Sequence, residues 1–356
     1  MERKLASVQK ILDIQPIEGA DKIVRAQING WWVVTAIENG FNINDLVCYL
    51  EIDSFVPTEL APFLSKGKEP REFEGVKGER LRTIRLRKQL SQGMIIPIPQ
   101  SVIDGAGTQV EEGLDLTEHL GIKKWEMPMN AQLQGMARGN FPSFIHKTDQ
   151  ERCQNIPREI REAYENGEEF EVSVKFDGSS MTVYGTHPLT VDDVVMDRET
   201  GVCSRNLDLK MEGNEENAFI KKAVSSGLLD KMKLITNNFA IQGELYGVGI
   251  QNNRENIVGH KFAVFDIFDI DTQTYLSPNL RQEFIRELKS DGVDVDHVEI
   301  LHNNWKLPSP DISDLLLMAE GVNSAGNQRE GLVFKSTSRD FSFKAISNLY
   351  LLTDGD

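Results

Sequence analysis

Cysteine is scarce in this chain, and histidine shows no ligand pattern. The 356 residues include three cysteines, Cys48, Cys153 and Cys203, which lie far apart and form no CxxC pair. An odd number of isolated cysteines argues against a structural zinc site and a disulfide framework, and it is typical of a reducing compartment. None of the six histidines has the spacing of a metal ligand.

Long apolar runs are also missing. No stretch approaches the ~20 apolar residues that a membrane-spanning helix needs. The first residues, MERKLASVQKILDIQ, lack the apolar segment of a secretion signal. We therefore expect no membrane partner and a cytoplasmic location, or the cytoplasm of a host cell if the protein is viral. The length predicts about two domains, and we expect a monomer.

The chain has fewer basic than acidic residues, but many of the basic residues lie in one stretch. The chain has 39 Lys and Arg against 55 Asp and Glu, a net charge of −16. Residues 1–150 contribute −2 of this and residues 151–356 contribute −14. Lys66 to Lys88 holds nine basic and four acidic residues. A basic stretch is sufficient for contact with phosphates, so the acidity of the whole chain does not exclude nucleic acid.

Residues 1–130 have the pattern of a small β-barrel. Short apolar or alternating runs are separated by Gly, Asn and Asp turns, at the spacing of a five-stranded barrel of the OB type. Arg80–Arg87 alternates as a further strand. Its arginines fit two interpretations: a charged edge strand that prevents aggregation, or a track for a nucleic-acid backbone. The other predicted strands are Ser7–Ile14, Ile23–Ile28, Trp31–Thr35 and Leu46–Ile52.

Residues 131–356 predict a second domain, of the α+β class with antiparallel sheets. Thr148 or Asp149 is placed to cap a short helix that carries Arg152. We expect Phe170–Val174 and Met181–Tyr184 to form a hairpin. The remaining predicted elements are helices Ala218–Ser225 and Leu280–Ser290 and strands Phe239–Tyr246, Lys261–Ile270, Gly331–Lys335 and Phe341–Ala345.

The turn inside this hairpin reads Lys175-Phe-Asp177-Gly178. A lysine becomes a good nucleophile when burial or a nearby cation lowers its pKa. Alone, such a tetrapeptide is common in turns and indicates no more than a solvated lysine. Further charged residues, however, recur at strand ends in a fixed order. They are Ser204-Arg205-Asn206, Gly243-Glu244-Leu245, Val264-Phe265-Asp266, Glu330-Gly-Leu-Val-Phe-Lys335 and Phe343-Lys344-Ala345.

In order and content these motifs resemble those of the covalent nucleotidyltransferase superfamily, which contains ATP-dependent ligases and mRNA capping enzymes. The resemblance covers about residues 145–350. The N-terminal barrel, with Arg82–Gly93 and Lys147-Thr-Asp149 leading to Arg152, is similar to RNA ligases of the Deinococcus/Naegleria type. The resemblance then extends over nearly the whole chain. It implies an enzyme that seals RNA 3′-OH and 5′-phosphate ends, at nicks, through a lysyl-AMP intermediate and an adenylylated RNA 5′ end.

The resemblance also implies a role for each motif residue. Lys175 would attack the α-phosphorus of ATP and carry AMP. Arg205 and Lys344, with Lys335 as a further catalytic candidate, would contact the AMP phosphate or sugar. Three carboxylates would hold a hydrated Mg²⁺ or Mn²⁺, and RNA would bind along Lys66–Lys88. The implied nucleotide-binding residues are Lys147, Arg152 (β- and γ-phosphates), Val174, Asp177, Gly178, Glu244, Phe265 (adenine) and Glu330, of which the metal-binding residues are Asp177, Glu244 and Glu330.

Two positions depart from the family pattern. The last motif is often Lys-x-Lys, whereas this chain has Ser342-Phe343-Lys344. Position 174 is valine, where many relatives have an acidic residue. Lys335 or an arginine is then expected to help neutralise the α-phosphate. Phe265 also has a plain structural interpretation, because a phenylalanine in a strand is often core.

Two other functions stay open on the sequence. A DNA ligase or a GTP-dependent capping enzyme shares these motifs but carries its OB domain after the last one, and only twelve residues follow Lys344. A non-catalytic RNA-binding protein with a degenerate ligase domain is the second. The intact Lys175, Glu244, Glu330 and Lys344 argue against it.

Overall fold

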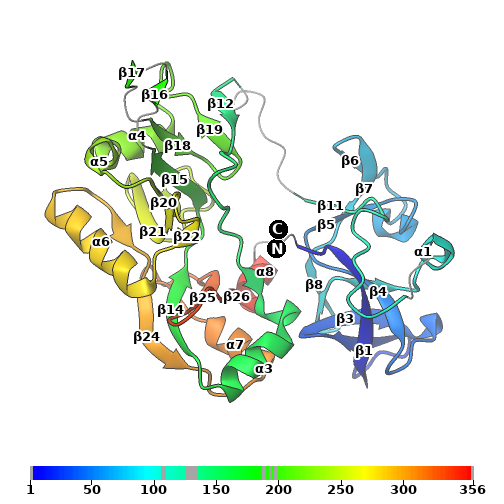
Figure 1. Ribbon diagram of the computed structural model, residues 1–356. Coiled ribbons are helices and arrows are strands. Elements are labelled where there is room, and N and C mark those ends of the chain that lie inside the picture. The colour runs from blue at the N-terminus through cyan, green and yellow to red at the C-terminus, as the bar shows by residue number, and fades with distance from the viewer. Residues whose placement is uncertain are drawn as a thin grey trace.

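The computed structural model has two parts, a blue N-terminal barrel and a larger region coloured from green to red (Figure 1). It describes residues 3–105, 110–125, 135–186, 190–191, 194–195 and 199–353. The predicted domain boundary between residues 130 and 131 lies outside these ranges.

The N-terminal part is built on one long, bent strand. β1 bulges between Ile11 and Asp13, pairing with β4 through its first half and with β2 through its second. A bulge of this kind bends a strand and lets a sheet curve toward closure. The resulting five-stranded sheet confirms the four predicted strands. In sheet order its members are β10 (Met94–Ile96), β4 (Leu46–Leu50), β1 (Ala6–Pro16), β2 (Ile23–Ile28) and β3 (Trp31–Ala36).

A second, four-stranded sheet and a separate hairpin complete this part. The prediction of a single strand over Arg80–Arg87 is wrong, because strand pairing is interrupted at Leu81: β7 ends at Arg80 and β8 begins at Thr83. The Leu81 side chain is buried in the core, and its N–H donates to the Ser54 carbonyl at 2.8 Å. The elements are β5 (Ser54–Pro57), β6 (Arg71–Phe73), β7 (Val76–Arg80), β11 (Lys123–Lys124), the hairpin strands β8 (Thr83–Leu86) and β9 (Gln89–Gln92), α1 (Gln100–Gly105), and the 3₁₀ turns Ile37–Asn39 and Pro62–Ser65.

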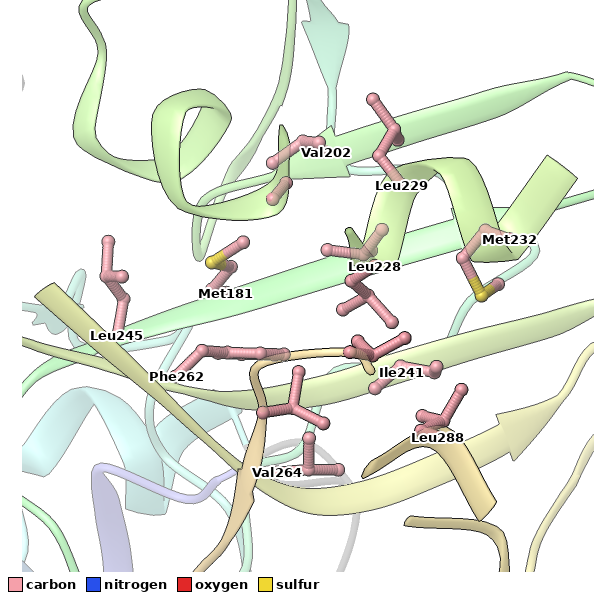
Figure 2. Close-up of a cluster of buried hydrophobic side chains, with 14 of the residues drawn as sticks. Met181, Val202, Leu228, Leu229, Met232, Ile241, Leu245, Phe262, Val264 and Leu288 are labelled. Atoms are coloured by element: carbon pink, nitrogen blue, oxygen red, sulfur yellow. The ribbon is translucent and has the colours of Figure 1, made fainter. Parts of the chain in front are cut away.

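The larger part contains an eight-stranded sheet with helices on its outer face. Side chains of β15, β18, β20 and β21 pack against α5 and α6, as Figure 2 shows for Met181, Val202, Leu228, Ile241 and Leu288. The strands are β12 (Ala137–Asn140), β15 (Ser179–Gly185), β18 (Thr200–Cys203), β19 (Leu207–Leu209), β20 (Phe239–Gly247), β21 (His260–Asp269), β22 (Thr274–Tyr275) and β23 (Asp296–His297). The helices are α4 (Ala218–Ser225), α5 (Leu228–Leu234) and α6 (Pro278–Ser290), and β16 (Thr190–Val191) pairs with β17 (Val194–Val195).

A five-stranded sheet faces the first one. Its members, in order, are β13 (Glu151–Arg152), β26 (Ser342–Ile346), β25 (Gly331–Ser336), β14 (Glu169–Lys175) and β24 (Ile300–Lys306). Its other face packs on α3 (Pro157–Glu165) and α7 (Ile312–Ala319). The chain ends in α8 (Asn348–Thr353).

Two sequence predictions fail in this sheet for a shared reason, long-range strand pairing. β14 and β15 form no hairpin: β14 pairs with β24 and β25, whereas β15 pairs with β18 and β20. Arg152 lies on no helix, because β13 pairs with β26 and a 3₁₀ turn, Cys153–Asn155, follows it. The lysine turn therefore carries the chain from one sheet to the other.

The two parts are joined by direct contacts. The Gly30 N–H donates to the Gln154 carbonyl at 3.0 Å, and a Cβ at position 30 would lie 2.8 Å from the Gln154 Cα. The Trp31 Nε1 donates to the Asn155 Oδ1 at 2.5 Å. Only a glycine permits this approach of the two backbones.

Candidate active site

Strand alternation places three lysines on one face of the five-stranded sheet. Successive side chains of a strand point to opposite faces, and the neighbours of these lysines, such as Val174, Phe334 and Phe343, belong to the core on the other face. Lys175 pairs with Gly331, and Lys344 pairs with Val333 on one side and Arg152 on the other. Lys175, Lys335 and Lys344 therefore line the space between the two sheets.

Lys175 is held by carboxylates. Its Nζ donates to the Glu330 Oε2 at 2.8 Å. Burial lowers the pKa of Lys175, but Glu330, Glu244 and Asp177 outweigh burial and raise the pKa above its usual value. The lysine is therefore a protonated ammonium in the absence of a ligand.

Glu244 reaches the same place from the opposite sheet. Burial, together with the charges of Glu330 and Asp177, raises the pKa of Glu244 to about 8, against the opposing effect of Lys175. In the described part of the chain, no group of three acidic, histidine or cysteine side chains is placed to hold a metal ion on its own. The oxygen donors instead fit a hard cation that keeps part of its water shell, as Mg²⁺ does.

Arg152, which is buried, and Lys344, which is half-buried, lie side by side in the sheet near Lys175. Burial, Arg152 and Lys175 lower the pKa of Lys344 to about 7. Arg152 is 7% exposed, and its Nε and Nη1 have no hydrogen-bond partner among the described residues. Buried donors are almost always satisfied, so these unpaired N–H groups of the guanidinium indicate an anionic ligand.

The N-terminal part holds Arg152 in place. The Asp53 Oδ2 accepts from the Arg152 Nη2 at 3.3 Å, and the Arg152 guanidinium lies 5.8 Å from the Trp31 ring centroid. Asp53 also accepts from Arg80 at 2.6 Å. Sequence reasoning missed Asp53 and Trp31, because nothing local to either residue signals a partner about 100 positions away.

Lys335 belongs to a buried ionic network behind the lysine turn. Its Nζ donates to the Asp266 Oδ1 and the Phe265 carbonyl, each at 2.6 Å, and lies 5.8 Å from the Phe265 ring centroid. Burial lowers the pKa of Lys335 against the pull of Asp266. Arg281, fully buried, joins Asp266 to Glu171. This network fixes the strand backbone at the half-buried Phe265.

Lys147 and Arg205 lie on the rim of the site. Arg205 pairs with Asp149 at 3.4 Å, and Lys147 donates to the Asn206 Oδ1 at 2.9 Å. Burial raises the pKa of Asp149, but Arg205, Lys124 and Lys344 lower it to about 2. A cavity of about 330 Å³ opens here, lined by residues that include Lys147, Asp149, Arg281, Lys335 and Ser342.

Two other predicted site residues have surroundings that the sequence did not indicate: Val174 lies in the core, and Asp177 has an arginine partner. The Val174 side chain is core, and its N–H donates to the Glu299 carbonyl at 2.8 Å. Asp177 pairs with Arg254 at 3.1 Å, on the loop after β20. Sequence reasoning missed Arg254, whose only signal is its place on the loop that follows the strand with the Gly243-Glu244-Leu245 motif.

A turn lysine close to three carboxylates, flanked by the buried Arg152 and the half-buried Lys344 and lying between two mainly antiparallel sheets, has the charge pattern of a nucleotidyltransferase site. An RNA ligase family model matches residues 168–346, and an OB-fold domain model matches residues 5–98. The chain belongs to the RNA ligase family, and it is an enzyme that joins RNA ends.

Solved structures of the Naegleria gruberi RNA ligase are similar over the whole chain. A lysine-to-alanine mutant with ATP and Mn has a TM-score of 0.85 and 42% identity, and the match covers 98% of each chain. The same ligase with PPi has a TM-score of 0.84, also at 42% identity and 98% coverage of each chain. A glutamate-to-alanine mutant with AMP and Mn has a TM-score of 0.85, with the same identity and coverage.

No curated protein matches the chain. None of the helices within the described ranges combines the length and apolar character needed to cross a bilayer.

Proposed function

We propose that this RNA ligase uses ATP to seal RNA 3′-OH and 5′-phosphate ends at nicks, with AMP carried on the Lys175 Nζ. The observation that carries the proposal is the set of charges around Lys175: the carboxylates of Glu330, Glu244 and Asp177, together with the half-buried Lys344, whose strand neighbour is the buried Arg152. The Naegleria gruberi ligase, solved with ATP and Mn and with AMP and Mn, supports the choice of nucleotide and of Mn²⁺ or Mg²⁺.

The reaction divides into three balanced transfers. The Lys175 Nζ attacks the α-phosphorus, the bond from that phosphorus to the bridging oxygen breaks, pyrophosphate leaves and Nζ loses a proton. An oxygen of the RNA 5′-phosphate then attacks the α-phosphorus, the P–N bond breaks, and Nζ regains a proton as the lysine leaves. Finally the RNA 3′-oxygen attacks the 5′-phosphorus, its proton is lost and AMP leaves.

The proposed roles follow from charge. Lys344 and Arg152 stabilise the negative charge that develops on the phosphates, since preorganised cations act most strongly where water is excluded. Asp177, Glu244 and Glu330 would hold the hydrated divalent ion, which supplies charge neutralisation at the α-phosphate and favours neutral Lys175. Lys335 would act by fixing Phe265 against adenine. Lys147 and Arg205, with Asp149, would close the rim over the sugar and phosphate.

The finer proposals concern the surroundings of the site. We propose that residues 1–130 form the nucleic-acid-binding domain and residues 131–356 the adenylation domain, with RNA contacts along Lys66–Lys88. We also propose that the enzyme works as a monomer in a reducing cytoplasm, its own or a host's. The three cysteines, which are all free and buried thiols, support the reducing compartment.

Labelled nucleotide tests the proposed intermediate. The protein is incubated with α-labelled ATP or GTP and Mn²⁺ and then denatured. We expect stable label from ATP, none in Lys175→Ala, and full label in Lys233→Ala, a control lysine that is exposed and pairs with Asp230 at 2.8 Å. Nicked duplexes with RNA or DNA at the nick then define the substrate. Label from GTP alone, or sealing of DNA nicks alone, would overturn the proposal.

A further inference from the structure

The hairpin of β8 and β9 has an unusual turn. Leu86 pairs with Gln89, so the turn consists of Arg87 and Lys88 alone. Both residues have positive φ, 46° and 66°. Two-residue turns of this shape strongly favour Asn-Gly, because most side chains are strained at positive φ. Such strain persists where a function requires the residue, and here the two strained positions both carry a cation.

The same hairpin carries cationic side chains that form no ion pair within the described ranges. In the same basic stretch, Arg71, Lys77 and Arg80 pair with Glu79, Glu69 and Asp53 at 3.7, 3.7 and 2.6 Å, and the exposed Lys66 and Lys68 lie before β6, outside the hairpin. Arg85, Arg87 and Lys88 are exposed and take part in no ion pair among the described residues. In a chain of net charge −16, three neighbouring free cations are a distinct surface.

The hairpin stands where the two parts of the molecule meet. β8 contacts α8, the helix that follows the Lys344 strand, and both lie at the centre of Figure 1. The Arg254 guanidinium lies 4.6 Å from the ring centroid of Tyr350 on α8, and Arg254 pairs with Asp177 of the lysine turn. One continuous set of contacts thus leads from the hairpin to the active site.

We propose that the β8–β9 hairpin is a binding element for the RNA backbone that holds the nick at the active site during the two RNA-dependent transfers. The inference rests on the proposed function and narrows its basic track to three residues. Phosphates are the partner that free cations recognise without regard to base sequence. Within the described ranges, none of the three cations has a side-chain hydrogen bond or ion pair to the lysine turn or its carboxylates, so we expect self-adenylylation not to depend on them.

Two variants separate charge from backbone strain. Arg87→Asn with Lys88→Gly removes both tip charges and installs the sequence that the turn favours, so its thermal stability is expected to equal or exceed that of the parent protein. Arg85→Gln removes one charge from an ordinary strand position. The control, Lys22→Gln with Arg161→Gln, removes two exposed charges elsewhere.

The measurement is the affinity of each variant for a nicked RNA duplex at several salt concentrations, beside its rate of adduct formation with ATP. We expect the tip variant to bind at least ~10-fold more weakly. The slope of its log affinity against log salt concentration should decrease by the equivalent of about two phosphate contacts. Arg85→Gln should lose about one contact, and the control none. Adduct formation should stay within about twofold of the parent rate throughout.

Unchanged affinity and salt dependence in the tip variant would overturn the inference, as would a parallel loss of adduct formation. Absence of an ATP adduct in the parent protein would instead overturn the proposed function. The two failures are therefore distinguishable.

Discussion

At the scale of single residues, the pKa values of two neighbouring lysines, Lys175 and Lys344, are shifted in opposite directions. Carboxylates from both sheets raise the pKa of Lys175 despite its burial. Burial, Arg152 and Lys175 lower the pKa of Lys344 to about 7. Without a ligand, Lys175, the proposed nucleophile, therefore keeps its proton. Lys344 is a cation that can titrate near neutral pH, at the place proposed for the phosphate.

Replacing Lys344 by Met should separate stability from activity. Because the folded-state pKa of Lys344 is below its unfolded value, the buried charge is destabilising below pH 7, and the cost disappears as the pH rises through the unfolded pKa near ~10.5. Lys344→Met should therefore melt several degrees higher than the parent at pH 6, with a smaller gain at pH 9. Adduct formation should fall about 10²- to 10³-fold.

Thermal melts at the two pH values and a rate assay check this prediction. A larger stability gain at pH 9 than at pH 6 would show that Lys344 does not carry the depressed pKa. An unchanged rate would remove Lys344 from the catalytic set.

At the scale of elements, the site depends on a turn that crosses between sheets. A Cβ on Gly178 would lie 2.4 Å from the Leu245 carbonyl oxygen of β20. The glycine is therefore required by close approach, and its absent side chain lets the lysine turn dock on the strand that carries Glu244.

Gly178→Ala should move the lysine turn away from β20. Moving a catalytic side chain by about 1 Å can reduce the rate ~100-fold. The rate of adduct formation should therefore fall about 100-fold. Gly139→Ala is the matched control, since its added Cβ meets no atom within 4 Å. Wild-type adduct formation in Gly178→Ala would contradict the crossing geometry.

Local pattern was sufficient for most elements and for the motif residues. Alternation in Phe170–Val174 and in Gly331–Lys335 predicts both strands and their buried faces. Strand partnership is not local, so β14 and β15, adjacent in sequence, were wrongly paired with one another. The break at Leu81 and the strand at Arg152 depend likewise on distant backbones. Arg254 and Asp53 escaped detection because each is defined only by the charge it meets after folding.

At the scale of the whole molecule, the N-terminal barrel contacts residues of the candidate active site. Asp53, Trp31 and Gly30 contact Arg152 and its neighbours Gln154 and Asn155. Arg152 lies next to Lys344 in the sheet. The barrel therefore positions Arg152, the residue of the other part of the chain that we propose for the ATP phosphates.

Asp53→Asn should weaken adduct formation as well as sealing. A hydrogen bond to a charged group is worth about 1.5–3 kcal/mol, so we expect roughly a tenfold lower rate at limiting ATP. Asp21→Asn, an exposed position on the same part of the chain, should have no effect. A variant that seals poorly but forms the adduct at the parent rate would limit the barrel to RNA binding.

The most direct test of the central claim is to map the nucleotide on the protein. The parent chain is incubated with ATP and Mn²⁺, digested under conditions that preserve phosphoramidates, and examined by mass spectrometry. We predict one AMP adduct, on the peptide that contains Lys175, which disappears when nicked RNA with a 5′-phosphate is added. An adduct on any other residue, or one that RNA does not discharge, would contradict the assignment of Lys175 as the nucleophile of RNA ligation.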